Sequence, residues 1–451
     1  MANDIAGVLL HGFGFMFLFT AFQTSTVIEP SVLQSNETEG GLGDRGDEVG
    51  FNSVAIIYSI FTAANWVAPS IVALLGAKWT MALSGLSYVG FIAAIIHPIE
   101  GVIYALAALL GFCAGSLWTA QGKYLTMCSD KSTMGRNAGI FWAMMETSLV
   151  LGNAFVFFYL KGDTTNISMT ERYIIYGVLT GCGVFGVSLF LCLRRKTETT
   201  DSNVQFSLSG GKEKSEPSPV LAAFYKAGNL LKTKEMLCIS LFCFYTGLDL
   251  TFFSSVYDTA VGNSVLPPKF GPTLGKKYVP LTGLFIGVGE IVAGLLFGLL
   301  GKKFVRHGRD PIVVIGLISH IVCYFLVFTS IPSNAPFEEA HDLSKTPYPL
   351  LLGPNLYLAQ CAAFLLGFGD ACFNTQIYSI IMALYQEDSA PPFALYKFFQ
   401  SLAAAAGFFY SSHLLLHYQL IILVFFAVIG ASAFIHVEWN SKRYSGYTPI
   451  Q

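Results

Sequence analysis

Long apolar stretches separated by shorter polar connections make up most of the chain. A helix needs about 20 apolar residues to cross the roughly 30 Å hydrocarbon core of a bilayer. About twelve stretches approach or exceed that length, so the pattern predicts an all-α membrane protein with about twelve transmembrane helices. The expected spans are approximately 5–27, 52–75, 79–97, 101–127, 137–160, 173–193, 236–260, 280–300, 311–331, 351–381, 391–412 and 416–437.

The composition agrees with a chain that is embedded in a lipid bilayer. Hydrophobic residues make up 53% of the sequence and charged residues 12%, against roughly 25% charged in soluble domains. The mean hydropathy is +0.58. The expected partner is therefore the lipid bilayer. A net charge of −2 gives no support for a nucleic-acid partner, which calls for a basic patch.

The sequence offers no catalytic or metal-binding signature. The nine cysteines lie almost wholly in apolar stretches without ligand spacing, and His413 and His417 have no third ligand near them. No arrangement typical of nucleophilic catalysis is recognisable. We therefore expect no metal, no cofactor and no enzymatic activity.

A long polar segment divides the chain in two. Residues 194–235 form a linker with an amphipathic stretch at Val220–Leu231, which predicts a helix on the membrane surface. The linker separates a six-helix half, 1–193, from a second one, 236–451, that ends in a short tail. Short segments recur in the same order in both halves: Leu109–Phe112, for example, matches Leu365–Phe368. The pattern predicts an internal duplication, which is typical of transporters with a central binding site.

The distribution of lysines and arginines among the loops predicts the orientation of the chain in the membrane. With both termini in the cytosol, 17 lysines and arginines lie on the cytosolic side and 7 on the other, as the positive-inside rule requires. Two glycosylation acceptors, Asn36 and Asn166, both fall in loops that this orientation places outside. The sequence does not distinguish the plasma membrane from an endolysosomal membrane.

Several polar residues lie inside the expected spans. A charge at the bilayer centre costs about 2.5–3.5 kcal/mol on insertion scales, so such side chains usually face the protein interior or a wet cavity. Glu290 shares its helix face with four glycines, which indicates that it points into protein. We expect a shared cavity between the halves, lined by Gln23, Asn65, Gln121, Glu146, Asp249, Glu290, Asp370, Asn374, Gln376, Lys397 and Gln400.

Two interpretations of these residues stay open. Desolvation favours the neutral form of a carboxyl group, so the acids could carry protons, while Lys397 could neutralise an acid or hold an anionic solute. Alternatively, the same groups could tie helices together by hydrogen bonds without touching a solute.

Five segments resemble a known family. They are Phe17–Thr24, Leu117–Gly122, Gly135–Trp142, Tyr245–Phe253 and Gly367–Gln376, and they resemble the Unc-ninety-three-like branch of the major facilitator superfamily. The resemblance implies twelve spans and a solute-carrier-like fold. It implies no substrate, and some relatives in this branch regulate channels or escort receptors.

One departure from the superfamily pattern bears on function. Its transporters usually carry an acid in the loop after the second span, whereas Leu75–Trp79 has none. Two hypotheses follow. The first is a secondary transporter of a small solute, proton-coupled through its buried acids. The second is a non-transporting membrane subunit or escort that binds another membrane protein.

Overall fold

The structure is a computed structural model that describes residues 4–34, 42, 45–159, 168–195, 219–264, 279–299, 308–337 and 351–444. All regular elements in these residues are helical. The first bundle contains α1 (Ile5–Gln34), α2 (Gly46–Ala64), α3 (Ala68–Ala94), α4 (Glu100–Met127), α5 (Met134–Tyr159) and α6 (Met169–Cys192).

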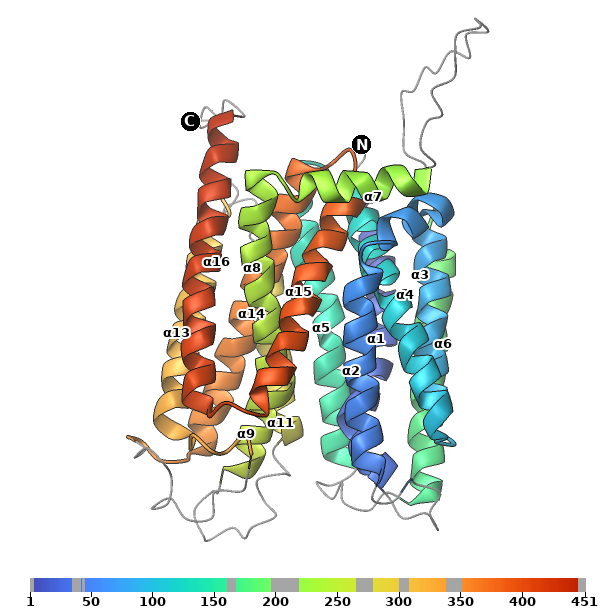
Figure 1. Ribbon diagram of the computed structural model, residues 1–451, viewed down its shortest axis with the longest axis vertical. Helices are drawn as coiled ribbons and strands as arrows, with labels where there is room; N and C mark the ends of the chain where they lie inside the picture. Colours follow the sequence, from blue (N-terminus) through green and yellow to red (C-terminus); the bar gives the residue numbers. More distant parts are fainter. Residues whose placement is uncertain are drawn as a thin grey trace, which may run out of the picture.

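The second bundle lies beside the first (Figure 1). Its first span begins as α8 (Lys234–Thr251), passes through the π-helix Phe252–Val256 and ends as α9 (Tyr257–Asn263). The other members are α11 (Val279–Leu299), α13 (Asp310–Ser330), α14 (Leu356–Leu384), α15 (Ala390–Ser411) and α16 (Leu416–Tyr444).

The expected spans are largely, but not all, confirmed. Every expected stretch contains helix, and ten helices in the described residues are long and apolar enough to cross a membrane. Helix α2 offers only the shorter apolar stretch Asn52–Ala64, and α15 is not among the ten. Polar residues explain the weaker signal of α15, which carries Lys397, Gln400 and Ser401.

Two expected boundaries are wrong: the end of the second span and the start of the third, which was expected at residue 79. The second span ends at Ala64 and not at residue 75, because the chain turns at residues 65–67 and α3 begins at Ala68. Helix α3 then bends at Gly76, whose φ of 74° lies in the left-handed region that glycine adopts without strain.

A helix is present where the amphipathic stretch of the linker predicted one: α7 (Pro219–Leu230). It runs across the ends of the membrane helices, at the end where α1 begins and α16 finishes (Figure 1). Phe224 packs against Trp66 of the first bundle with tilted rings, whose centroids are 5.7 Å apart. Lys226 forms an ion pair of 2.6 Å with Asp388 of the second bundle. Helix α7 therefore contacts both bundles.

Helices α5 and α11 form a close contact between the bundles. A Cβ atom added at Gly139 would lie 2.6 Å from the carbonyl oxygen of Gly294 and 2.8 Å from Cα of Gly298. Because glycine has no side chain, the two backbones approach as they do in small-residue membrane contacts. The glycine face of α11, which also carries Glu290, thus packs on α5.

Candidate functional site

The buried acids and the buried lysine lie where the two bundles meet. Glu146 comes from α5 of the first bundle, and its electrostatic neighbours Asp370 and Lys397 come from α14 and α15 of the second. Glu290 on α11 neighbours both Glu146 and Asp370. Each of these side chains is at most 5% exposed. Acidic groups from three helices therefore share one interior region with a single lysine.

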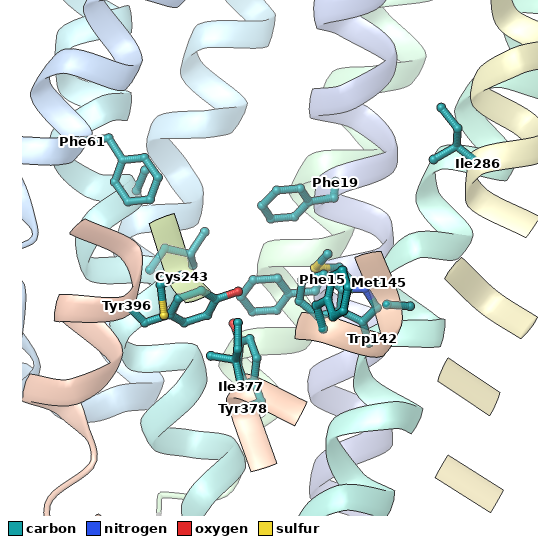
Figure 2. Packing of buried hydrophobic residues seen from close by; sticks show 14 of the residues in the cluster. Phe15, Phe19, Phe61, Trp142, Met145, Cys243, Ile286, Ile377, Tyr378 and Tyr396 are labelled. Carbon is teal, nitrogen blue, oxygen red and sulfur yellow. The ribbon is translucent and has the colours of Figure 1, made fainter. Parts of the chain in front are cut away.

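A tryptophan links Glu290 to the opposite bundle. Trp142 Nε1 on α5 donates a hydrogen bond of 2.5 Å to Glu290 Oε2. The other oxygen, Oε1, is buried and has no hydrogen-bond partner among the described residues. Figure 2 shows Trp142, Phe15, Tyr378 and Tyr396 among the buried residues of the core. Glu290 thus reaches across the interface to Trp142, with Asp370 beside it.

Lys397 lies among aromatic rings. Its ammonium nitrogen is 4.1 Å from the ring centroid of Trp118 on α4 and 4.5 Å from that of Tyr396. It is 6.0 Å from the ring of Tyr378 and donates a hydrogen bond of 2.7 Å to Gln400 Oε1. Within the described part of the chain, no carboxylate pairs with it at salt-bridge distance. Desolvated cation–π contacts are worth about 2 kcal/mol or more, so these ring faces favour the charged form of the Lys397 amine.

Amide and hydroxyl groups connect Lys397 to Asp370. Gln400 Nε2 donates to the Tyr396 hydroxyl at 3.5 Å, and Tyr396 in turn donates to Asn374 Oδ1. Asn374 Nδ2 completes the connection with a bond of 2.7 Å to Asp370 Oδ1. Asn374 and Gln400 therefore belong to this hydrogen-bonded cluster.

Gln121 forms a second polar link between the bundles. Its Oε1 on α4 accepts a hydrogen bond of 2.7 Å from the Tyr378 hydroxyl on α14. Tyr378 also packs against Trp142, at a centroid distance of 5.8 Å. Gln121 therefore borders the cluster through Tyr378.

Asp249 belongs to a neighbouring network inside the second bundle. Its Oδ1 accepts a hydrogen bond of 2.9 Å from the Tyr324 hydroxyl, which lies 2.8 Å from the hydroxyl of Tyr245. Tyr245 also bonds to Nδ1 of His320. Asp370 is an electrostatic neighbour of both Asp249 and His320, so the two networks adjoin.

Three of the expected cavity residues make local or separate contacts. Gln23 is half-buried and accepts a hydrogen bond of 2.5 Å from Ser148 within the first bundle. Asn65 donates to the Phe61 carbonyl of its own helix, and Gln376 to the neighbouring Thr375. These contacts do not connect the three residues to the acids. Asn36 and Asn166 lie outside the described residues.

Sequence reasoning missed Trp142, Tyr245, His320 and Tyr324 as members of the site. His320 and Tyr324 are one helical turn apart on α13, within a very apolar helix. A histidine and a tyrosine sharing one face of such a helix is the signal that could have found them. Trp142 offered no such signal, because a lone tryptophan is usually a packing residue.

Comparison with known sequences identifies the family. A sequence profile described as "Ion channel regulatory protein UNC-93" matches residues 45–435. The chain belongs to the UNC-93 family. It is 42% identical to the UNC93-like protein MFSD11 of Xenopus laevis over 457 residues, which cover 100% of this chain and 99% of that protein. The human protein unc-93 homolog A is 24% identical over 89% of this chain and 86% of its own length. The expected resemblance to this family is confirmed, and the chain is more similar to MFSD11 than to unc-93 homolog A.

Solved structures place this UNC-93 family member in a fold class. The E. coli fucose:proton symporter FucP matches with a TM-score of 0.62 at 12% identity, covering 97% of this chain and 99% of FucP. The human organic anion transporter MFSD10 matches with a TM-score of 0.61 at 12% identity, covering 97% and 100%. The chain therefore has the fold of major facilitator superfamily transporters and is an integral, multi-pass membrane protein.

Proposed function

We propose that this protein is a secondary transporter of a small organic solute, coupled to protons and working by alternating access between its two bundles. The cluster at the bundle interface carries the proposal. Glu146, Glu290, Asp370 and Lys397 come from both bundles, and solute sites of this fold lie at that interface. Relative movement of the bundles would change the surroundings of every one of these groups.

The contacts between bundles support this assignment. The bonds Trp142–Glu290 and Gln121–Tyr378, and the contact of Lys397 with Trp118, all cross the interface. A solute that competed for these groups would alter the balance between the two arrangements of the bundles. Acids that exchange protons at the same place would link that balance to the pH gradient.

A transport assay with a broad solute mixture tests the proposal. The purified full-length protein is placed in proteoliposomes with an inward proton gradient and a defined mixture of sugars, nucleosides, amino acids and organic anions. Mass spectrometry of the lumen then identifies accumulated compounds. We expect gradient-dependent accumulation by the wild type, and at least about tenfold less by Glu290→Gln and by Asp370→Asn.

Glu100→Gln is the matched control, because Glu100 is an exposed acid paired with Arg45 at 3.4 Å on the surface. It should transport like the wild type. Failure of every component to accumulate, or equal accumulation by the buried-acid variants when their elution profiles match the wild type, would overturn the proposal.

A second candidate function is a non-transporting subunit or escort of another membrane protein. The family description as an ion channel regulatory protein favours it, and so does the loop Leu75–Trp79 without its acid. Native mass spectrometry after gentle solubilisation separates the candidates. A stoichiometric complex with one membrane protein supports the second candidate, whereas a lone chain with bound small solute supports the transporter.

A further inference from the structure

Four buried side chains of the second bundle form a continuous chain of hydrogen bonds. Tyr245 and Asp249 lie one turn apart on α8, and His320 and Tyr324 lie one turn apart on α13. The contacts run from His320 Nδ1 to the Tyr245 hydroxyl, from there to the Tyr324 hydroxyl at 2.8 Å, and on to Asp249 Oδ1 at 2.9 Å. All four side chains are at most 2% exposed, so solvent does not compete for these bonds.

The backbone fixes the tautomer of His320. Its Nε2 lies 2.9 Å from the carbonyl oxygen of Leu366. A carbonyl oxygen only accepts hydrogen bonds, so Nε2 carries a hydrogen in both charge states of the ring. Gain or loss of a proton therefore takes place at Nδ1, the nitrogen that faces Tyr245.

The number of hydrogens that these contacts require limits the protonation states of the four side chains. Three contacts require three hydrogens, and the two tyrosine hydroxyls supply two of them. The third must come from a protonated Asp249 or from a protonated Nδ1 of His320. With an ionised Asp249 and a neutral His320, one of the three contacts would lack a hydrogen, which is costly in a buried network.

We propose that Asp249, Tyr324, Tyr245 and His320 form a relay that holds one proton and passes it between Asp249 and His320. In one direction, the Asp249 proton bonds to the Tyr324 oxygen, the Tyr324 proton to the Tyr245 oxygen, and the Tyr245 proton to His320 Nδ1. Each tyrosine gains one proton as it loses another, so both stay neutral and only the direction of the hydrogen bonds reverses.

The direct route between the end groups is too long for a hydrogen bond. Asp249 Oδ1 and His320 Nδ1 are 3.7 Å apart, while Tyr324 makes a longer side contact of 3.4 Å with Nδ1. The tyrosine hydroxyls therefore supply the path. Other titratable groups lie near the relay and must stay unmutated in every variant that tests it. They are Asp370 and Cys361 on α14, Cys323 on α13 and Tyr410 on α15.

Solid-state NMR of ¹⁵N-histidine in the full-length protein, reconstituted in lipid, tests the relay without any solute. The His320→Gln variant identifies the His320 signals, and spectra across pH of about 5–8 report the charged and neutral forms of the ring. We expect hydrogen on Nε2 at every pH. We also expect Asp249→Asn to lower the ratio of charged to neutral His320 at least about tenfold, because the amide cannot hold or release the shared proton and carries no negative charge to stabilise the imidazolium.

A double-mutant cycle separates the relay from a simple charge pair. In the Tyr324→Phe background, Asp249→Asn should change the His320 ratio by a clearly smaller factor than in the wild type, since the hydrogen-bonded connection is lost and only the direct charge interaction across 3.7 Å remains. An equal effect in both backgrounds would overturn the relay. If Tyr324→Phe fails to fold, Tyr245→Phe removes the other hydroxyl of the relay and provides an independent test. Tyr257→Phe is the matched control, because its buried hydroxyl bonds to the Ala359 carbonyl at 2.5 Å and lies outside the relay.

The relay would serve the proton coupling of the proposed transporter, and its use in transport rests on that function. The NMR result is independent of it. A relay that is present in a protein unable to accumulate any solute would contradict the transporter and leave the relay standing. Proton-coupled uptake that persists unchanged in Tyr245→Phe and Tyr324→Phe would contradict the coupling role alone.

Discussion

The contacts of individual buried residues say most about the function of this protein, and they are the least predictable from its sequence. Periodicity placed Lys397 and Gln400 on one face of their helix, and they are hydrogen-bonded at 2.7 Å. It could not indicate that the ring of Trp118, from the other bundle, lies 4.1 Å from the same ammonium group. A helical repeat reports the face of its own helix and contains no information on which residue of a distant helix lies opposite.

The bond between Trp142 and Glu290 leads to a prediction at this scale. Trp142→Phe removes the donor and leaves a buried carboxyl group without it, so we expect a loss of about 1–3 kcal/mol in the free energy of unfolding. Thermal unfolding of the purified protein measures the change. Trp439→Phe is the control, because the indole of Trp439 is exposed and makes a long bond of 3.3 Å to Asp310. Equal losses in both variants would contradict a special role for the buried bond.

Asp130 gives a pH-dependent prediction outside the membrane spans. Hydrogen bonds from Ser132, followed by those from Thr133, hold the pKa of Asp130 below its usual range. A carboxyl group with a lowered folded pKa contributes stability above its unfolded pKa of about 3.9, and this stability is lost as the pH falls through the folded value. Amide hydrogen exchange in the turn 128–134, corrected for intrinsic rates, should therefore accelerate below a pH of about 4. In Asp130→Asn this turn should show no such acid-dependent step.

At the scale of elements, the sequence predicted nearly every helix but not the details of their ends. The turn at 65–67 lies inside an apolar stretch, so hydropathy joined α2 to the start of α3. The π-helix Phe252–Val256 was equally invisible in the pattern. Eight residues separate Asp249 from Tyr257, and at 3.6 residues per turn their side chains would point roughly 80° apart. Because the π-helix adds one residue to its turn, both side chains instead face the interior of the second bundle.

The contact between α5 and α11 supports a prediction about these two elements. A methyl group at Gly139 would meet backbone atoms of Gly294 and Gly298, which cannot rotate away as a side chain can. We expect Gly139→Ala to lower the free energy of unfolding by about 1–3 kcal/mol, measured by thermal unfolding. Gly177→Ala on α6 is the control, since no described heavy atom lies within 4 Å of the added methyl group. A Gly139→Ala protein as stable as this control would show that the helices are farther apart.

At the scale of the whole molecule, the fold follows from the sequence because lipid permits few solutions. Each backbone polar group in the hydrocarbon core must bond internally, so long apolar stretches become helices. The grouping into halves was read from weak repeats, and the division into two duplicated domains stays a prediction. The arrangement of acids at their interface needed coordinates, since it depends on which helices of the two bundles touch.

Glycosylation tests the orientation of the whole molecule. The start of α1, the end of α16 and α7 lie at one end of the bundles, which agrees with termini on the side of the linker (Figure 1). We expect glycans at Asn36 and Asn166 if that side is cytosolic. Enzymatic deglycosylation should increase the mobility of the protein on a gel. The double variant Asn36→Gln with Asn166→Gln should lose this shift, and a wild-type protein without any shift would contradict the orientation.

Helix α7 has a mechanical consequence for any cycle in which the bundles tilt. It is tied to Trp66 in one bundle and to Asp388 in the other, so parting the bundles at this end must stretch or break one of the two ties. Parting them at the opposite end leaves both ties intact. These two contacts therefore oppose opening of the bundles at this end only, and the exposed ion pair contributes at most about 1 kcal/mol to that opposition.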